Sequence, residues 1–289
     1  MDRNIIILAG GASSRMKQSS LAWDVDARVA LEIKSKPKAM LTVGNGPRPF
    51  LDYLLFNAEK SGHTQVAIVV GEGDNSIRQY YEEDGGAKQF RNLAICYLVQ
   101  EIPIGRVKPL GTADALLQAL RALRHWRGKR FTVCNADNLY SVAALTLLLN
   151  DQHDNAMIDY DRAALEFSEE RIAQFAVTVK SKNGYLSDII EKPSSGEVGG
   201  AQDEHGRIGV SMNIWRFKYE HILPFLESLP VHPVRQEKEL PVAVKAMIAA
   251  HPLSVFAIPL AEHVIDLTTQ SDIAIVQDYL RREFPLMSR

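Results

Sequence analysis

The chain has 289 residues, 46% of them hydrophobic, which is enough for one large α/β domain or two small ones with a full core. Its 33 basic and 35 acidic residues give a formal net charge of -2 without a long run of one sign, which argues against a nucleic-acid partner. No apolar run approaches membrane-spanning length, and the N-terminal run is too short for a signal peptide. We therefore expect a cytoplasmic protein with no membrane partner.

The two cysteines, Cys96 and Cys134, lie inside apolar runs and have no second pair that would make a zinc site. We expect both to be buried, reduced thiols. The 8 histidines show no metal-ligand spacing and are interpreted as surface or packing residues.

The chain begins with a predicted buried strand, Ile5 to Leu8, that leads into Gly10, Gly11 and a small polar stretch ending in Arg15. Glycines let backbone N–H groups approach an anion, serines add hydroxyl donors, and an arginine adds a permanent charge. The stretch lacks the third glycine of a dinucleotide loop and the Gly-Lys-Ser/Thr ending of a P-loop. Taken alone, it is also compatible with an ordinary turn between a strand and a helix.

A polar stretch from Lys17 to Lys36 follows, and we expect a mobile excursion over the site. Lys38 then precedes a helix predicted from Leu51 to Lys60 and ended by Gly62. The Lys38 amine could reach a triphosphate from this place, although a lysine after proline is more often simply solvated.

The rest of the first half alternates strands with helices, as in a parallel sheet. Asp137 comes just after the last of these strands, where open α/β sheets bind ligands. The predicted elements are strands 65–70, 93–99 and 130–134, a helix around 76–81, a helix capped by Thr112, and a helix capped by Ser141 that ends near Leu149.

The second half contains a predicted hairpin, 175–180 and 185–190, because Asn183-Gly184 suits a type I′ turn. No repeat or linker divides the chain into independent domains. The further predicted elements are strands 208–217 and 253–258, helices 219–229, 237–250 and 272–282, and a short apolar segment that ends at Asp266.

Asp137 and Asp266 are candidate metal ligands, since each follows an apolar strand and Mg²⁺ needs only one or two protein carboxylates. For either residue alone, a turn or a helix cap is the simpler interpretation. Lys192 could bind a phosphate and Glu191 sugar hydroxyls, or the two could form an exposed ion pair.

Ser211 and Asn213 alternate with Met212 and Ile214 in the predicted strand 208–217. Strand geometry puts both polar side chains on one face, where they could line a polyol pocket.

Seven motifs occur in the order found in sugar-1-phosphate nucleotidyltransferases, and this resemblance covers nearly the whole chain. The motifs resemble the catalytic domain of ADP-glucose pyrophosphorylase, while the length resembles glucose-1-phosphate thymidylyl- and uridylyltransferases without an appended β-helix. They are IIILAGGASSRM, SKPKAML, QEI with LGTADAL, VCNADNLY, the hairpin into IIEKP, VSMNIWRF and VIDLTT.

The resemblance implies a three-layer α/β/α sandwich with a Rossmann-like, mixed but mostly parallel sheet. It implies one catalytic domain over 1–289, with a nucleotide-binding half (1–150) and a sugar-phosphate-binding half (151–289). The implied reaction joins a nucleoside triphosphate to a sugar-1-phosphate, giving an NDP-sugar and pyrophosphate, with Mg²⁺ as cofactor. Homo-oligomerisation is left open.

The resemblance also implies roles for individual residues. The implied catalytic residues are Arg15, Lys38 and Lys192; the nucleotide-binding residues Leu8, Ala9, Gly10, Gly11, Gln100, Gly111 and Thr112; the sugar-phosphate-binding residues Asn138, Glu191, Ser211 and Asn213; and the metal ligands Asp137 and Asp266.

Some features depart from the family pattern. The loop is more like that of molybdopterin guanylyltransferase and the cytidylyltransferases, the gaps from Arg15 to Lys38 and from Gln100 to Gly111 are long, and Ala136 replaces a common glycine. The identity of the nucleotide base and of the acceptor therefore stays open.

The alternatives are a cytidylyl- or guanylyltransferase-like enzyme for a non-hexose acceptor, or a catalytically silent nucleotide-binding regulatory domain. A Rossmann oxidoreductase is disfavoured because GxGxxG is missing.

Overall fold

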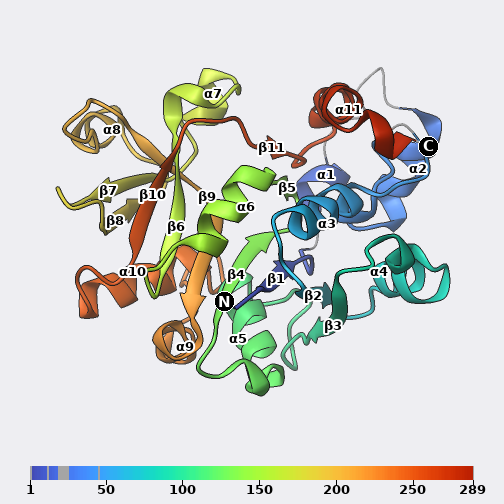
Figure 1. Cartoon of the computed structure of the whole chain (residues 1–289), viewed down its shortest axis with the longest axis horizontal. Coiled ribbons are helices and arrows are strands. Elements are labelled where there is room, and N and C mark those ends of the chain that lie inside the picture. Colours follow the sequence, from blue (N-terminus) through green and yellow to red (C-terminus); the bar gives the residue numbers. More distant parts are fainter. Residues whose placement is uncertain (1, 12, 19–25, 45, 289) are drawn as a thin grey trace.

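The computed structural model describes residues 2–11, 13–18, 26–44 and 46–288. Within these ranges the main sheet has nine strands, seven of them in the order β10-β6-β9-β4-β1-β2-β3 (Figure 1). Along that path β9 is antiparallel to both of its neighbours and the other pairs are parallel. The bounds are β1 Asn4–Leu8, β2 Gln65–Gly71, β3 Ala94–Gln100, β4 Arg130–Asn135, β6 Ala156–Asp161, β9 Gly209–Lys218 and β10 Phe256–Leu260.

Two smaller strand pairs extend this sheet or stand beside it. The hairpin of β7 (Val177–Lys180) and β8 (Leu186–Ile190) joins the main sheet through β9. The short strands β5 (Asn138–Leu139) and β11 (Ile265–Asp266) form a separate antiparallel pair.

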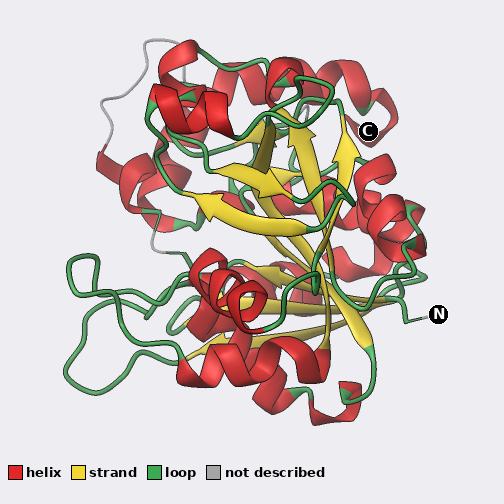
Figure 2. Ribbon diagram, turned by 90° about the vertical axis from the view of Figure 1, so that its left-hand side faces the viewer, coloured by secondary structure: helices red, strands yellow, loops and turns green. Residues whose placement is uncertain are grey.

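Helices cover both faces of the sheet (Figure 2). Alternate residues of β1 enter opposite cores: Ile5 and Ile7 pack with α3, α6 and α11, whereas Ile6 and Leu8 pack with α5, α9 and α10. This confirms the predicted three-layer sandwich with a mixed, mostly parallel sheet. The bounds are α1 Ser14–Gln18, α2 Ala27–Ser35, α3 Phe50–Lys60, α4 Ser76–Arg78, α5 Thr112–Ala122, α6 Val142–Asn150, α7 Glu169–Ile172, α8 Ser195–Gly200, α9 Tyr219–Ser228, α10 Leu240–Ala250 and α11 Asp272–Glu283.

No helix in the described part of the chain is both long and apolar enough to span a bilayer. Ser141 caps α6 as predicted, since its side chain accepts a hydrogen bond from the Ala144 N–H.

Strand β6 was not predicted. Its sequence AMIDYD carries Asp159 in the middle, which weakens the apolar pattern, yet this side chain is fully buried. Lys180 Nζ lies 3.1 Å and Arg207 Nη1 2.7 Å from the Asp159 carboxylate. Two cations distant in sequence therefore make a charge tolerable inside the sheet.

The predicted cap of α5 was wrong. Gly111 is the N-cap residue, with φ 99°, and Thr112 is the first helical residue. The Thr112 hydroxyl instead accepts a hydrogen bond from the Leu240 N–H at 2.9 Å, so it joins α5 to α10.

The hairpin is present, but its turn is not type I′. That turn needs positive φ at two successive residues, whereas only Gly184 (φ 78°) has it there. The Gly184 N–H donates to the Ser181 oxygen at 3.0 Å, and the Ser181 N–H to the Tyr185 oxygen at 2.8 Å. The turn is therefore a tight bend followed by a left-handed glycine.

The stretch 17–36 is not simply an irregular excursion. Helix α2 occupies much of it, with Asp26 as N-cap and with Val29 and Ile33 buried. Residues 19–25, on which the rest of this prediction falls, lie outside the described residues.

The prediction that both cysteines are buried was correct for one of them only. Cys134 is buried, but Cys96, on the edge strand β3, is exposed.

Candidate active site

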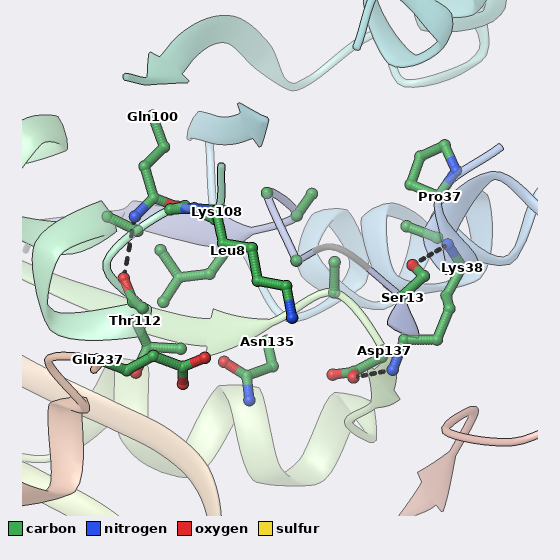
Figure 3. Close-up of a pocket in the computed structure, with 18 of the residues that line it drawn as sticks. Leu8, Ser13, Pro37, Lys38, Gln100, Lys108, Thr112, Asn135, Asp137 and Glu237 are labelled. Atoms are coloured by element: carbon green, nitrogen blue, oxygen red, sulfur yellow. Dashed lines mark hydrogen bonds and ion pairs between the residues drawn. The ribbon is translucent and has the colours of Figure 1, made fainter. Parts of the chain in front are cut away.

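A cavity of about 390 Å³ lies at the carboxyl ends of β1, β3 and β4 (Figure 3). It brings together segments that are far apart in the sequence, as expected for ligands of an open α/β sheet. Ten of the residues singled out from the sequence line it: Leu8, Ala9, Gly10, Gly11, Arg15, Lys38, Gln100, Gly111, Thr112 and Asp137.

The glycine loop follows β1 and packs closely against β2. A Cβ on Gly10 would lie 3.1 Å from Gln100 Oε1 and 3.3 Å from the Gly71 nitrogen, so a side chain there would crowd both. Further along, Ser13 has φ 54°, and its Oγ accepts a hydrogen bond from the Lys38 N–H at 3.3 Å. The loop is thus tied to the segment that carries Lys38.

Lys38 and Asp137 form an ion pair inside the cavity. Lys38 begins a short 3-10 turn whose next residues, Ala39 and Met40, are buried and fix its place. Asp137 follows β4, and Lys38 Nζ lies 2.6 Å from Asp137 Oδ2. In Figure 3 the lysine chain runs along the wall of the cavity to this carboxylate.

Asp266 lies next to Asp137, as the sequence predicted. Asn138 pairs with Asp266 in the short β5–β11 sheet, and the Leu267 N–H donates to the Asp137 backbone oxygen at 2.8 Å. Burial and, next, the charge of Asp137 raise the pKa of Asp266. The pairing of two short strands therefore explains how two carboxylates distant in sequence become neighbours.

The Asp266 carboxylate already has two protein partners. Thr268 Oγ1 donates to Oδ1 at 2.6 Å, and Arg171 Nη2 donates to Oδ2 at 2.8 Å. Arg171 also pairs with Asp272 and lies over the Phe167 ring, 4.6 Å from its centroid. Each Asp266 oxygen keeps one lone pair for another partner.

These carboxylates fit Mg²⁺ better than a metal held entirely by protein. Mg²⁺ takes one or two carboxylates and completes its shell with phosphate oxygens and water. Among the described residues, no group of three or more His, Cys, Asp or Glu side chains could hold a metal ion. Asp137 and Asp266 together match the smaller requirement.

The other end of the cavity is formed where β3 ends and α5 begins. A Cβ on Gly111 would lie 2.8 Å from the Lys238 oxygen, so its positive φ and this close contact both favour glycine. Gln100 Nε2 donates to the Gly111 oxygen at 3.0 Å, and the Lys238 oxygen accepts the Ala113 N–H at 2.9 Å. The start of α5 is therefore held from both halves of the chain.

Several lining residues were not identified from the sequence. Lys108 and Glu237 both extend into the space near Asn135 in Figure 3. The segment 237–239 reaches the cavity because the Lys238 N–H donates to the Leu110 oxygen. No local sequence pattern predicts this contact. The polar lining residues missed in this way are Lys108, Asn135, Glu237 and Glu239.

The residues assigned to the sugar phosphate, with Lys192, are not among those that line this cavity. Asn138 is buried, with its Oδ1 3.3 Å from the oxygen of Tyr140, whose hydroxyl donates to the Met212 backbone oxygen at 2.7 Å. Glu191 and Lys192 are exposed after β8, and Lys192 has φ 47°. Partial desolvation and, next, the charge of Glu239, which lines the cavity, raise the pKa of Glu191.

The strand with Ser211 and Asn213 departs from regular alternation. Met212 and Ile214 both enter the core with α3 and α6, as the alternation predicts. At Asn213 the backbone has φ 56°, and the register between β6 and β9 shifts opposite this point. This irregularity interrupts the regular strand geometry from which a shared face for Ser211 and Asn213 was predicted.

The sequence matches a known family, and the fold matches that of known proteins. The model of the family described as nucleotidyl transferase matches residues 4–249, and the chain belongs to this family. This confirms the resemblance to sugar-1-phosphate nucleotidyltransferases, an enzyme class.

Curated relatives are distant and diverse. Bifunctional protein GlmU of Staphylococcus carnosus is 22% identical over 83% of the chain, and glucose-1-phosphate adenylyltransferase of Corynebacterium glutamicum 21% identical over 77%. The chain spans only 44% and 50% of these two proteins. The D-glycero-alpha-D-manno-heptose 1-phosphate guanylyltransferase of Campylobacter jejuni is 24% identical over 63% of the chain and 72% of its own length.

A solved structure of UDP-glucose pyrophosphorylase complexed with UDP-glucose has the same fold, with a TM-score of 0.68 and 16% identity. The superposition covers 98% of this chain and 100% of the other. At this identity the similarity establishes the architecture alone.

Proposed function

We propose that the chain transfers a nucleotidyl group from a nucleoside triphosphate to a sugar-1-phosphate, giving an NDP-sugar and pyrophosphate with Mg²⁺. The observation that carries this proposal is that one cavity is lined by Arg15 and has Lys38 and Asp137 at one end and Gln100 and Thr112 at the other (Figure 3). The family of the chain and the printed names of its relatives support it.

The chemistry requires little from the protein besides alignment and charge neutralisation. A sugar-1-phosphate is already an anion near neutral pH, since its second pKa is about 6. One of its oxygens attacks the α-phosphorus, a new P–O bond forms, and the bond to the β-phosphate breaks as pyrophosphate leaves. No general base is needed.

The charged end of the cavity suits the triphosphate. Arg15 and Lys38 would bind its phosphates, and backbone groups from Leu8 to Gly11 would lie along it. Asp137 and Asp266 would hold Mg²⁺, which when bound neutralises phosphate charge. Thr112 and Gly111 would adjoin the ribose or base.

The second half, together with Asn138 of the first half, would bind the sugar phosphate. Lys192 would bind a phosphate and Glu191 would accept hydrogen bonds from sugar hydroxyls; the charge of Glu239, a cavity residue, acts on Glu191. Asn138, Ser211 and Asn213 complete this part of the proposal. The division into halves 1–150 and 151–289, a cytoplasmic location and the oligomeric state stay predictions.

The test is a pyrophosphate-release screen of nucleoside triphosphates against a panel of sugar-1-phosphates and other phosphorylated acceptors, with Mg²⁺. Turnover with at least one pair is the expected result. If turnover occurs only with a non-hexose acceptor, that acceptor replaces the sugar-1-phosphate in the proposal. Pure folded protein that turns over no pair would favour the regulatory domain.

A further inference from the structure

Lys108 lies on the loop 101–110, which joins β3 to α5 and makes the gap between Gln100 and Gly111 long. Its side chain lines the candidate active site, and Figure 3 shows it extending from the loop into the cavity. Its neighbour Val107 instead lines a second, adjoining cavity of about 430 Å³. The loop therefore lies between two cavities, and Lys108 faces the one that would bind the nucleotide.

The loop that carries Lys108 is anchored near both of its ends. Near its start, the Ile102 N–H donates to Glu72 Oε2 at 2.6 Å. At its end, the Leu110 oxygen accepts the Lys238 N–H, which comes from the second half of the chain. The backbone position of Lys108 is therefore set by contacts with segments on both sides of the cavity.

The charge of Lys108 is available to a bound anion. Of the described residues that line the cavity, three are basic: Arg15, Lys38 and Lys108. Lys38 pairs with Asp137 at 2.6 Å, whereas Lys108 forms no ion pair with any residue that the structure describes. An anion that enters the cavity can therefore pair with Lys108 without breaking an existing contact.

The place of the Lys108 ammonium group indicates which phosphate it would meet. In Figure 3 this group lies between Thr112 and Asp137. In the proposed function the ribose or base adjoins Thr112, and the metal ion on the triphosphate is held by Asp137. The α-phosphate joins the ribose to the other two phosphates, so a nucleotide that spans the cavity places its α-phosphate between the two ends.

We propose that Lys108 is a further catalytic residue, which binds the α-phosphate of the nucleotide and neutralises its charge while the sugar-1-phosphate attacks. This inference rests on the proposed function, and it names a residue that lies outside all seven family motifs. The attacking sugar-1-phosphate and the α-phosphate are both anions and repel each other. A cation placed at the attacked phosphate weakens this repulsion and stabilises the transition state.

The experiment is steady-state pyrophosphate release with Mg²⁺ and the nucleoside triphosphate and sugar-1-phosphate pair that turns over fastest in the screen. Lys108→Met removes the charge and roughly keeps the length of the side chain, and it should lower kcat by about tenfold or more. Lys108→Arg keeps a positive charge at this place, so its kcat should stay within about threefold of the wild type.

Lys129→Met is the matched control. Lys129 is exposed and directly precedes β4, whereas the cavity lies at the carboxyl end of that strand. The variant removes the same charge from the chain and should keep the wild-type kcat. The melting temperatures of all three variants should match that of the wild type, since both lysines are exposed.

The inference alone is overturned if the wild type turns over and Lys108→Met keeps its kcat. A higher KM for the nucleotide with an unchanged kcat counts as this outcome, because such a contact is equally strong before and during the reaction. A loss of kcat that Lys108→Arg shares would also overturn it, since charge would not be the cause. If the wild type turns over no pair, the proposed function fails and this inference fails with it.

Discussion

Lys38 Nζ lies 2.6 Å from Asp137 Oδ2. The ammonium group therefore lies beside the carboxylate that would also bind the metal ion. The Lys38 side chain is only 12% exposed, and this pair is therefore less screened than a surface pair. Binding of a magnesium nucleotide would release Lys38 from Asp137 toward the phosphates. Lys38 would thus pair with Asp137 before the nucleotide binds and with the phosphates afterwards.

Lys38→Met should lower kcat/KM for the nucleoside triphosphate about a hundredfold, because one cation that neutralises phosphate charge is lost. Steady-state kinetics at saturating Mg²⁺ measure this. Lys36→Met is the control, since Lys36 pairs with Glu32 on α2 and is more exposed. Comparable kinetics for the two variants would remove Lys38 from the mechanism.

Asp137→Asn and Asp266→Asn should each reduce turnover by about a hundredfold or more, since each removes a charge that would hold Mg²⁺ while keeping the shape. Stability should scarcely fall, because burial and Asp137 already disfavour the ionised form of Asp266. Turnover and melting temperature are measured together. Asp154→Asn, at an exposed aspartate, is the control.

Near-wild-type turnover in both carboxylate variants would contradict the metal assignment. A large drop in melting temperature would instead return the two residues to structural roles in a turn and a cap.

Lys192→Met should raise KM for the sugar-1-phosphate about tenfold and leave nucleotide binding unchanged, because Lys192 stands outside the cavity that Lys38 and Asp137 line. Its melting temperature should match the wild type, since the side chain is exposed. Lys182→Met, in the exposed β7–β8 turn, is the control. If Lys192→Met changes nucleotide binding but leaves KM for the sugar-1-phosphate unchanged, Lys192 contacts the nucleotide instead.

Much of the site could be predicted because its residues follow strands. Gln100 ends β3 and Asp137 follows β4, and the ends of parallel strands meet at one edge of the sheet. Asp266 was harder to place, yet its short apolar run was enough to suggest a strand end.

The rest depends on contacts between distant segments. Glu237 reaches the cavity only because Lys238 pairs with Leu110, and nothing near Glu237 in the sequence signals this. Strand β6 was missed because Asp159 breaks its apolar run, and the partners that neutralise this charge are distant in sequence.

His63 provides a prediction about stability that is independent of activity. The ring is buried between two hydroxyls: Nδ1 is 2.9 Å from Ser61 Oγ, and Nε2 is 3.2 Å from Thr132 Oγ1. Ser61 donates its own hydrogen to the Ala58 oxygen, so it accepts from Nδ1–H, and Nε2 is left to accept from Thr132. The neutral ring is therefore satisfied on both sides. Burial and, next, the charge of Arg216 lower the pKa of His63 to about 4.

In the unfolded chain this histidine titrates near its model value of 6.5, so between that pH and about 4 the unfolded state binds more protons than the folded state. Stability is therefore fully present above pH 6.5 and is lost as the pH falls toward 4, by at most about 3 kcal/mol. Thermal unfolding of the wild type and of His63→Gln from pH 7 to pH 4 measures this loss. The variant should be less stable at pH 7, since Ser61 and Thr132 lose a partner, but its melting temperature should fall less steeply with acid. His205→Gln, at an exposed histidine, should follow the wild-type curve. If His63→Gln and the wild type lose stability in parallel, the acid sensitivity comes from other groups.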